Sequence, residues 1–476
     1  MYIVQIGSEV APYAKVGGLG DVVLGLSRKL HQEGHDVDVI IPKYDCLKGI
    51  EKMTLYKDGV QSLFQDAWHD NSIYHAPLNE EMSLTLLEAH HARRFFERGA
   101  IYGFPDDVDR FLYFSRACLD FLANEKKIPD IIHIHDWMCA PIAFLIRQEP
   151  FLKKFAKTRV VLSIHNMEYQ GWAYPHLMQA VGYTVPLEPL KMPFSQDVNC
   201  LKGGIVFADA VTTVSPTYAK EVMTEEGGKG LQEVMKAHSA KFSGILNGID
   251  STYWNPENDR YLKYHFSSQH FAGKTKNKHF LQEQLGLERQ DHHPLLATIC
   301  RLVPQKGVHL IKEAVLRAND WGVQCVILGS THEPKIQEEF TKLAEKFATD
   351  KNIRIILKND ERLAHEIYAA ADLFLVPSIF EPCGLTQMIA MSYGAVPIVR
   401  KTGGLADTVF DGVNGFSFIP PEVRELEATV RRAVGLYKKD KNAWHQLMQA
   451  GMLADWSWKE SCGDFLALYK KILLSS

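Results

Sequence analysis

The chain has 476 residues, of which 46% are hydrophobic and 23% are charged, and its formal net charge is −4. A chain of this length exceeds what one hydrophobic core usually supports, so we expect two domains. The composition is ordinary for a globular protein, and a slight negative charge without a basic stripe argues against a nucleic-acid partner.

The sequence shows none of the usual signs of export or membrane insertion. The first predicted strand follows Met1 directly, without a basic region or cleavage site, and no apolar run is long enough to cross a bilayer. The eight cysteines are scattered and form no C-x-x-C pair, which is typical of reduced thiols. We therefore expect a cytoplasmic protein that does not bind membranes.

In the first half, short β-branched runs alternate with longer amphipathic stretches, a pattern typical of parallel sheets covered by helices. One helix begins near Gly18 and is stopped by Gly34, and two more are predicted over residues 110–122 and 141–147. Strands are predicted over residues 2–6, 36–41, 131–135, 160–164 and 210–214.

A polar stretch after Asn247-Gly-Ile-Asp250 separates this series from a second α/β series. The second series has a helix over residues 274–285, and its strands are predicted over residues 295–300, 325–328, 353–356, 373–376 and 396–399. The sequence therefore predicts two α/β domains, residues 1–245 and 246–455. Residues 456–476 carry apolar side chains at helical spacing, and this helix could cap either domain.

Two similar glycine-rich segments occur near opposite ends of the chain. Lys15-Val-Gly-Gly-Leu-Gly-Asp21 returns as Lys401-Thr-Gly-Gly-Leu-Ala-Asp407. Each is typical of a helix start at which small residues admit a ligand, free amides face an anion and a lysine adds positive charge. They indicate a ligand that carries both sugar and phosphate. The alternative is two surface turns that share small residues.

Polar clusters follow two predicted strands of the first half, at the place where ligands collect in doubly wound sheets. His133-Ile-His-Asp-Trp closes one strand, and Ser163-Ile-His-Asn closes another. The His-x-His pair points both imidazoles to one strand face and could ligate a metal, but no third ligand occurs at a recognisable spacing. We therefore favour structural histidines.

Two cations follow the first strand of the second half. Arg301 and Lys306 flank a turn that contains Pro304, and a helix begins after it at Gly307. They could clamp two phosphates, the arginine through paired hydrogen bonds and the lysine as a mobile point charge. Taken alone, they could equally be solvated loop residues.

A carboxylate precedes another helix start. Glu381-Pro-Cys383-Gly-Leu-Thr-Gln follows the strand predicted over residues 373–376. The carboxylate can face a sugar while free amides of the helix start bind a neighbouring phosphate. A surface loop more usually consists of hydrophilic turn residues, so we favour function here. A nucleophilic cysteine would need a base, and we find none for Cys383. Packing beside the carboxylate would be enough to explain why a cysteine stands at this position.

Two Asp-x-Asp triplets, which begin at Asp36 and Asp107, could bind a metal–diphosphate complex. The first leads into a strand and the second lies in an acidic helix start, so we interpret both as structural. Cationic side chains and helix dipoles would then neutralise a diphosphate, and we expect no metal or other cofactor.

Together and in this order, the motifs resemble those of bacterial glycogen synthases and plant starch synthases, which are retaining glucosyltransferases. The resemblance covers nearly the whole chain. It rests on Lys15-x-Gly17-Gly18-Leu-Gly-Asp21-Val, His133-x-His135-Asp136-Trp137, His165-Asn166, Asn247-Gly248-Ile249-Asp250, Arg301-Leu-x-x-Gln305-Lys306-Gly307, Pro377-Ser378-x-Phe380-Glu381-Pro382-Cys383-Gly384-Leu385-Thr386-Gln387 and Lys401-Thr-Gly403-Gly404-Leu405.

The resemblance implies an α/β GT-B fold, in which two Rossmann-like, doubly wound domains enclose an active-site cleft. Residues 1–245 would serve the glucan acceptor and residues 246–455 the nucleotide-sugar donor, and the helix over residues 456–476 would cross back to the N-terminal domain. The implied reaction transfers glucose from ADP-glucose to the non-reducing end of an α-1,4-glucan, with retention of configuration, in glycogen biosynthesis.

The resemblance also implies which residues act. The residues implied to be catalytic are Glu381, His165, Lys306, Arg301 and Lys15. The residues implied to bind substrate are Lys15, Gly17, Gly18, Asp21, Asp136, Asn166, Asn247, Cys383, Gly384, Leu385 and Thr386, with Glu9 facing the acceptor glucan. In this assignment Arg301 and Lys306 bind the diphosphate, and Glu381 faces the reacting sugar.

One departure from the family pattern bears on the donor. Where the family usually has an aromatic residue that stacks on adenine, this chain has Asn359, and Val16 replaces a common threonine. UDP-glucose therefore stays open as a donor. Another two-lobe transferase is an alternative, against which Glu9 and the Lys15-Val-Gly-Gly-Leu segment argue, and a pyridoxal-dependent phosphorylase is a second. A non-catalytic glucan- or nucleotide-binding regulator is a third, against which the intact Lys15, Arg301, Lys306 and Glu381 argue.

Overall fold

The computed structural model describes residues 1–475 except residues 51, 79–81, 150 and 194. It divides into two compact units. Unit 1 comprises Met1–Gly248 and Trp458–Ser476, and unit 2 comprises Ile249–Ser457. The last helix of the chain thus belongs to the same unit as the N-terminal half.

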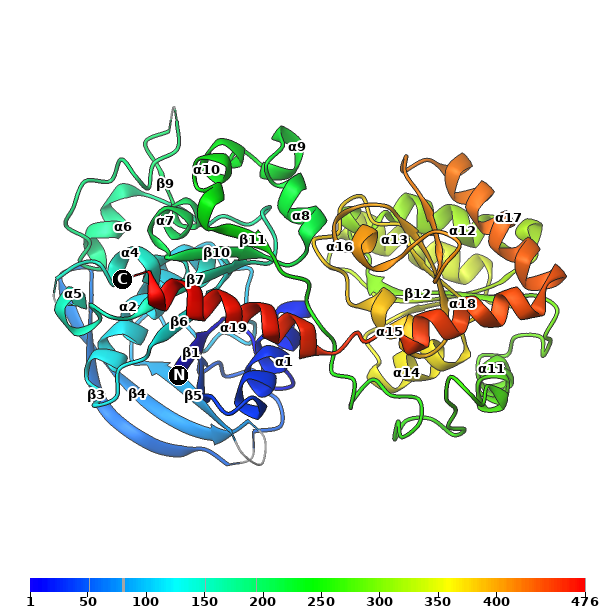
Figure 1. The fold of residues 1–476 in the computed structure, drawn as a ribbon, viewed down its shortest axis with the longest axis horizontal. Helices are drawn as coiled ribbons and strands as arrows, with labels where there is room; N and C mark the ends of the chain where they lie inside the picture. Colours follow the sequence, from blue (N-terminus) through cyan, green and yellow to red (C-terminus); the bar gives the residue numbers. More distant parts are fainter. Residues whose placement is uncertain (51, 79–81, 150, 194, 476) are drawn as a thin grey trace. The chain divides into compact units, whose positions relative to one another are not determined.

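Unit 1 is built on a nine-stranded sheet in the order β11-β10-β7-β6-β1-β2-β5-β4-β3 (Figure 1). The strands of this sheet are β1 (Tyr2–Ile6), β2 (Asp36–Pro42), β3 (Thr54–Phe64), β4 (Ala67–Pro77), β5 (Ser83–Ala89), β6 (Ile131–His135), β7 (Arg159–Ile164), β10 (Ala210–Thr213) and β11 (Phe242–Gly244). A separate two-stranded ribbon pairs β8 (Trp172–Ala173) with β9 (Val198–Asn199). The five strands predicted in this half are all present, with ends that differ by at most one residue.

The central strands of unit 1 are parallel, and only the outer hairpin departs from this rule. β4 runs antiparallel to both β3 and β5, whereas β5 pairs in parallel with β2. β6 is buried along its whole length, as expected for a parallel strand covered on both faces. The order of the strands reverses between β1 and β6, so the loops after these two strands open at the same switch point.

Helices pack on the sheet of unit 1 (Figure 1). They are α1 (Gly18–Gln32), α2 (Asp107–Ala123), α3 (Asp136–Cys139), α4 (Pro141–Leu145), α5 (Phe151–Lys154), α6 (Pro175–Ala180), α7 (Cys200–Phe207), α8 (Pro216–Glu221), α9 (Glu225–Gly228), α10 (Gln232–Ala237) and α19 (Trp458–Leu474). The C-terminal helix α19 contacts α1, where a Cβ on Gly25 would lie 2.0 Å from Nε1 of Trp458. Its buried face includes Phe465, Tyr469 and Ile472.

Unit 2 contains a six-stranded parallel sheet in the order β14-β13-β12-β15-β16-β17. Its strands are β12 (Leu295–Arg301), β13 (Gln324–Ser330), β14 (Ile353–Leu357), β15 (Leu373–Val376), β16 (Val396–Arg400) and β17 (Phe416–Phe418). Its helices are α11 (Ala272–Gln284), α12 (Val308–Trp321), α13 (Pro334–Lys346), α14 (Glu361–Ala370), α15 (Thr386–Ser392), α16 (Gly403–Thr408), α17 (Val423–Lys439) and α18 (Lys441–Leu453). The order reverses between β12 and β15, which makes the loops after these strands the expected ligand site of the unit.

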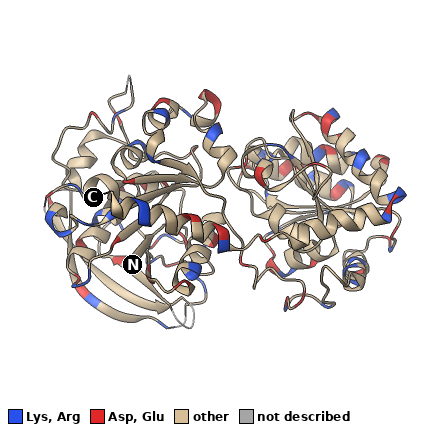
Figure 2. Cartoon of the chain, in the orientation of Figure 1, with Lys and Arg blue, Asp and Glu red and all other residues tan. Residues whose placement is uncertain are grey.

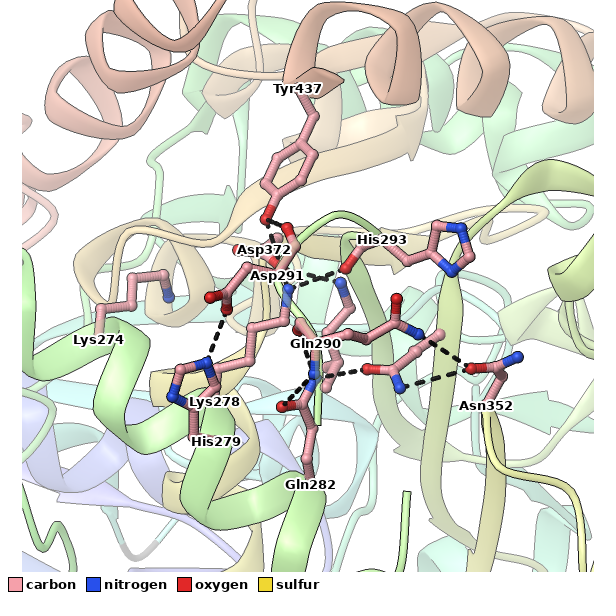
Figure 3. Close-up of polar contacts among 12 residues, drawn as sticks. Lys274, Lys278, His279, Gln282, Gln290, Asp291, His293, Asn352, Asp372 and Tyr437 are labelled. Carbon is pink, nitrogen blue, oxygen red and sulfur yellow. Dashed lines mark hydrogen bonds and ion pairs between the residues drawn. The ribbon is translucent and has the colours of Figure 1, made fainter. Parts of the chain in front are cut away.

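A buried polar cluster fastens the amino-terminal ends of β12 and β15 in unit 2. Lys278, on α11, donates to Oδ2 of Asp372 at 2.7 Å and to the carbonyl oxygen of His293 at 2.9 Å (Figure 3). The same carboxylate oxygen accepts the backbone N–H of Leu295 at 2.8 Å. The charge of Lys278 is thus paired and hydrogen-bonded, as a buried ammonium group requires. The cluster holds the opposite end of the sheet from the loops at the switch point.

Charged side chains are distributed over both units, with Lys and Arg interspersed among Asp and Glu (Figure 2). This agrees with the small net charge and with the absence of a basic stripe in the sequence. Within the described part of the chain, none of the helices combines the length and the apolar character that a membrane span requires.

Candidate active site

In unit 2, the loops after β12 and β15 bring an ion pair to the switch point of the sheet. Nζ of Lys306 lies 2.6 Å from Oε2 of Glu381, and Oγ of Ser378 donates to the same oxygen at 2.7 Å. The Glu381 side chain is only 6% exposed and that of Lys306 19% exposed. The two residues predicted to act on the sugar and on the diphosphate are therefore directly bonded to each other.

The sequence folds this way because the two loops are held together by their backbones. The N–H of Ile379 donates to the carbonyl oxygen of Gln305 at 2.8 Å, and Nε2 of Gln305 reaches the carbonyl oxygen of Phe380 at 3.3 Å. Gly307 has a φ of +69°, and a Cβ there would lie 2.2 Å from the carbonyl oxygen of Pro377. Only glycine fits this close approach, which sets Lys306 opposite Glu381.

The second glycine-rich segment packs its backbone against the loop that carries Glu381. A Cβ on Gly403 would lie 2.0 Å from the carbonyl oxygen of Glu381, and one on Gly404 would lie 2.2 Å from that of Cys383. The N–H of Gly404 donates to the carbonyl oxygens of Glu381 and Pro382. The Gly404 amide is thus bonded within the protein and the glycines of the segment allow close backbone packing, while a phosphate at this helix start stays a prediction.

The other residues of unit 2 that were predicted to act lie on or beside the same two loops as Lys306 and Glu381. Arg301 is exposed at the end of β12. Cys383 is buried, and Gly384 has a φ of +74°, which turns the chain into α15 just before Leu385 and Thr386. Gln387 closes this turn, because its Nε2 donates to the carbonyl oxygen of Gly384 at 2.8 Å.

Asn359 lies in the turn between β14 and α14. Its side chain is exposed, and its two neighbours bond to each other, with Nζ of Lys358 2.7 Å from Oδ2 of Asp360. Asp360 also caps α14 by accepting the N–H of Leu363 at 3.0 Å. Lys358 and Asp360 line a cavity of about 230 Å³. This turn therefore offers polar and charged groups, without the aromatic ring usual in the family.

In unit 1, the buried carboxylate of Glu9 occupies the amides of the first glycine-rich segment. Its Oε2 accepts the N–H of Val16 at 2.6 Å and that of Gly17 at 3.0 Å, and its Oε1 accepts the hydroxyl of Tyr102 at 2.8 Å. Glu9 follows β1 and is 4% exposed. An internal anion thus lies on the amides at which the sequence predicted a ligand anion. The predicted role of Glu9 towards the acceptor stays a prediction.

The other predicted residues of this segment lie where α1 begins. Gly17 is the N-cap and Gly18 the first residue of the helix. Nζ of Lys15 forms an ion pair with Oδ1 of Asp21 at 2.8 Å, and both side chains are more than a third exposed. A half-exposed pair of this kind contributes little stability and separates at little cost, so Lys15 can turn to a ligand.

Asp136 organises the loops after β6 and β7. It has a left-handed backbone with a φ of +57°, which is uncommon for a residue with a side chain. Its Oδ1 accepts the N–H of His165 at 2.7 Å and that of Asn166 at 3.4 Å. Burial raises the pKa of Asp136 to about 7, an effect that these hydrogen bonds oppose. Backbone strain of this kind is often kept at functional sites.

The predicted glucosyl-binding residues are distributed along this edge of unit 1. The hydrogen bonds of Asp136 bring it together with His165 and Asn166. Asn247 is buried and follows β11, close in sequence to the point where the chain leaves unit 1. Burial lowers the pKa of His165 to about 3, so its ring is neutral. Oδ1 of Asn166 accepts the N–H of Glu168 at 3.0 Å, which fixes the turn after His165.

Several residues of the site carried no assigned role in the sequence. Ser378 holds Glu381, Tyr102 holds Glu9, and His135 contacts His165 at 3.0 Å between Nδ1 and Nε2. Ser378 and His135 belong to the quoted motifs, which was the available signal. Tyr102 lies in an irregular segment with no motif, so nothing in the sequence marked it. Among the described residues, no group of three or more His, Cys, Asp or Glu side chains is arranged to hold a metal ion.

The comparisons with known proteins define the class. A family model described as the starch synthase catalytic domain matches residues 2–237, and one described as glycosyl transferases group 1 matches residues 282–446. The two parallel-sheet units and these matches define a glycosyltransferase with the GT-B fold. The predicted fold class and the predicted enzyme class are confirmed.

The full-length similarities are more specific. The glycogen synthase of Protochlamydia amoebophila is 43% identical over 499 residues, which cover 99% of each chain. The probable starch synthase 4 of Arabidopsis thaliana is 45% identical over 488 residues, which cover 99% of this chain and 47% of that protein. The chain belongs to the family of bacterial glycogen synthases and plant starch synthases, which confirms the resemblance of its motifs.

Solved structures agree with this assignment. The catalytic domain of starch synthase IV from Arabidopsis thaliana, bound to ADP and acarbose, is similar with a TM-score of 0.95 and 45% identity, and the match covers 99% of both chains. Sucrose-phosphate synthase from Thermosynechococcus elongatus is similar with a TM-score of 0.65 at 16% identity, which shows the shared fold alone.

Proposed function

We propose that the protein is a glycogen synthase, which transfers glucose from ADP-glucose to the non-reducing end of an α-1,4-glucan with retention of configuration. The observation that carries this proposal is the pair of the partly buried Lys306 and the buried Glu381, 2.6 Å apart at the switch point of unit 2. A cation for a phosphate and a carboxylate for a sugar lie side by side at the place where such folds bind ligands. Family membership supports the same reaction.

Charge governs the chemistry. As the bond from the anomeric carbon to the phosphate oxygen breaks, negative charge grows on the leaving diphosphate and positive charge grows on the sugar. Lys306 and Arg301 stabilise the diphosphate, and Glu381 stabilises the sugar. Because Ser378 and Lys306 already hold the Glu381 carboxylate, this group needs little reorganisation when the donor binds. The backbone of Gly384, Leu385 and Thr386 provides amides to the phosphate.

We assign the glucosyl unit and the acceptor to unit 1. Asp136, His165, Asn166 and Asn247 hold the glucosyl unit, and Glu9 serves the acceptor glucan. Lys15 adds a cation to the nucleotide sugar, together with the backbone at Gly17 and Gly18 and the carboxylate of Asp21. The contacts that support this assignment are the Asp136 hydrogen bonds to the backbone of His165 and Asn166.

ADP-glucose is the donor we favour, because the similar starch synthase IV structure is described as bound to ADP. UDP-glucose as a significant second donor is supported by a specific observation. The exposed Asn359 has no ring on which adenine could stack. One contact that would favour adenine over uracil is therefore missing at this position.

We further propose that transfer needs neither a metal ion nor a prosthetic group. The cations Arg301, Lys306 and Lys15 suffice to balance the charge of a diphosphate. Full activity after treatment with a chelator supports this proposal, and activity that returns only with added divalent metal contradicts it. A cytoplasmic location also stays a prediction, which the eight free thiols support.

The direct test is elongation of a glucan primer with ADP-glucose and UDP-glucose offered separately. We expect transfer from ADP-glucose, a smaller but measurable rate with UDP-glucose, and new α-1,4 linkages in the product. The Lys306→Ala variant is the control for contaminating activity. No elongation from either donor by the folded protein contradicts the proposal. Transfer to an acceptor other than an α-1,4-glucan indicates a different GT-B transferase.

A further inference from the structure

A buried histidine of unit 2 connects the start of helix α14 to an irregular segment that lies far away in the sequence. His365 lies on α14 and has no exposed surface. Its partners come from residues 251–271, all of which are described and form no helix or strand. Glu361, the first residue of α14, lies one turn before His365 on the same face of the helix. Contacts of His365 therefore bear on the turn at Asn359, which directly precedes α14.

The first ring nitrogen of His365 is bonded to a buried carboxylate. Nδ1 lies 2.7 Å from Oδ2 of Asp259, a residue that is 3% exposed. The same oxygen accepts the hydroxyl of Tyr393 at 2.6 Å, and Oδ1 accepts the N–H of Tyr261 at 2.9 Å. Burial raises the pKa of Asp259, but the hydrogen bonds from His365 and Tyr393 outweigh burial and lower it overall. An ionised carboxylate can only accept, so Nδ1 of His365 carries a proton.

The second ring nitrogen of His365 faces another carboxylate. Nε2 lies 3.8 Å from Oε1 of Glu361 and has no hydrogen-bond partner among the described residues. Oε1 of Glu361 also accepts the hydroxyl of Tyr253 at 2.7 Å, and the Glu361 side chain is half exposed. A lone pair on Nε2 would point towards this negative charge, whereas an N–H would be attracted to it. The position of Glu361 therefore favours a second proton on the ring.

Aromatic rings pack around the imidazole of His365. The Trp254 ring stacks on it, with the ring centres 4.1 Å apart and the planes inclined by 15°. The ring centres of Tyr253 and Tyr261 lie 5.1 Å and 4.7 Å from it. The face of an indole ring attracts a cation, so the stack also favours a charged imidazole. Arg260 is exposed and donates to the Tyr261 hydroxyl at 2.8 Å, so solvent screens its opposing charge.

The charged ring connects two carboxylates of different exposure. Burial lowers the pKa of His365, but its interactions with Asp259 and Glu361 outweigh burial and raise it overall. Loss of one proton from the ring keeps the hydrogen bond from Nδ1 to Asp259 and removes the attraction between Nε2 and Glu361. The contact at the start of α14 is therefore the one that responds to pH.

We propose that His365 is an imidazolium in the folded protein and is a positioning residue for the turn at Asn359, because its charge holds Glu361 at the start of α14. The charge of the ring is a property of the protein without substrate. Its effect on the donor rests on the proposed function, in which the base of the nucleotide sugar lies at this turn. The contact with Glu361 should be complete below about pH 6.5 and should be lost as the pH rises through the raised pKa.

The first test measures the affinity for ADP by calorimetry between about pH 6 and pH 9, in the wild type and in Glu361→Gln. The variant keeps an acceptor for Tyr253 and removes the charge that faces Nε2 of His365. At the lower pH it should bind ADP about two- to fivefold more weakly, the range of one partly exposed ion pair. The wild-type affinity should fall to that of the variant as His365 loses its proton. A direct contact of Glu361 with the nucleotide would keep the two pH curves parallel, and parallel or identical curves overturn the proposal.

The second test determines the charge of the ring by ¹⁵N NMR of protein labelled at histidine. The His365→Gln variant identifies the signals of His365, and the signal that moves in Glu361→Gln identifies them if His365→Gln does not fold. Both ring nitrogens should be protonated in the wild type at about pH 6, and Glu361→Gln should lose the second proton at a lower pH than the wild type. A singly protonated ring at about pH 6, or equal titration of every histidine in the two proteins, overturns the proposal.

The matched control is His279→Gln. Nε2 of His279, on α11 of the same unit, lies 2.7 Å from Oδ1 of Asp291 (Figure 3). This variant also removes a histidine that contacts a carboxylate, and it should keep the wild-type affinity for ADP at each pH. An equal loss of affinity in His279→Gln overturns the proposal. A wild type that does not bind ADP contradicts the proposed function and the positioning role with it, whereas the titration of His365 still decides whether the ring is charged.

Discussion

The two glycine-rich segments share a sequence pattern but differ in what their backbone amides contact. In unit 1, the amides of Val16 and Gly17 bind the buried carboxylate of Glu9. In unit 2, the amide of Gly404 binds the carbonyl oxygens of Glu381 and Pro382. The first segment holds an anionic side chain at a helix start, and the second holds the loop that carries the Glu381 carboxylate. Similar sequences at helix starts therefore do not imply similar ligands, because the protein itself can supply the acceptor.

The largest expected effect concerns the charged pair of unit 2. Lys306→Ala and Glu381→Gln should each lower turnover by on the order of a hundredfold or more, because each removes a preorganised charge from the transition state. Steady-state kinetics with ADP-glucose measure this loss, and circular dichroism checks that each variant folds. Lys312→Ala, which removes an ion pair to Glu339 on the surface of the same unit, should be nearly neutral. Near-normal turnover in either variant of the pair would refute the assignment.

A second prediction concerns the glycines themselves. Gly404→Ala should reduce activity about tenfold or more and destabilise the protein by about 1–3 kcal/mol, because the new Cβ would lie 2.2 Å from the carbonyl oxygen of Cys383 and displace the Glu381 loop. Gly17→Ala is the matched control, since nothing lies within 4 Å of a Cβ there. Its stability should stay within about 0.5 kcal/mol of the wild type. Equal losses of stability in the two variants, measured by thermal unfolding, would remove the distinction between the segments.

A third prediction separates the units by acid stability. Burial lowers the pKa of His133 and of His165 to about 3, and burial and the neighbouring histidines lower the pKa of His135 well below its usual value. The unfolded chain therefore binds more protons below about pH 6.5, and the stability of unit 1 is lost as the pH falls from there towards 3. Burial raises the pKa of Asp136 to about 7, so this residue stabilises unit 1 as the pH falls from about 7 to about 4. This single carboxyl group opposes the effect of three imidazoles, so the net stability of unit 1 should still fall.

Unit 2 should behave differently in the same window. Burial lowers the pKa of His365, but its hydrogen bonds and charge interactions with Asp259 and Glu361 outweigh this and raise it overall. The stability of this pair is thus fully present below about pH 6.5 and is lost only as the pH rises through the raised pKa. Hydrogen exchange at about pH 7 and about pH 5, corrected for intrinsic rates, should show a larger loss of protection at the lower pH in unit 1 than in unit 2, where burial lowers the pKa of His293 alone among the histidines discussed. A uniform loss across both units would contradict this account.

The smallest expected effect concerns the donor base. Asn359→Tyr should lower KM for ADP-glucose by about 2- to 10-fold, the range that one stacking contact supplies, and should change turnover little. Competition between ADP-glucose and UDP-glucose measures the change in preference directly. Asn359→Gln, which keeps the amide without adding a ring, is the control. If the tyrosine variant shows no gain for ADP-glucose over UDP-glucose, residue 359 is not the place where the base is recognised.

The parallel strands could be predicted from the sequence because strands covered on both faces consist of apolar, β-branched runs. β12 and β15 are examples, and their ends agree with the prediction to within one residue. The longer strands β3, β4 and β5 and the short strands β8, β9, β11 and β17 were not predicted. Many side chains of β3 are exposed, so this strand lacks the continuous apolar run that marked the others.

The candidate site could be predicted as a set of residues, but the contacts among its members could not. Lys306 and Glu381 are separated by 75 residues, and their ion pair depends on a backbone approach at Gly307 that only the fold reveals. The contact of Glu9 with Val16 has the same origin, since a buried carboxylate and two free amides satisfy each other only once β1 and α1 are packed. The contact of His133 with Tyr469 depends on helix α19, whose apolar pattern did not indicate which unit it would cover.

The most direct test of the account is a double-mutant cycle on turnover, with Lys306→Ala, Glu381→Gln and the variant that carries both changes. Because the 2.6 Å pair acts as one catalytic group, the double variant should lose about as much turnover as either single variant. Losses that multiply in the double variant would show two independent residues and would contradict the claim that this pair is the centre of the reaction.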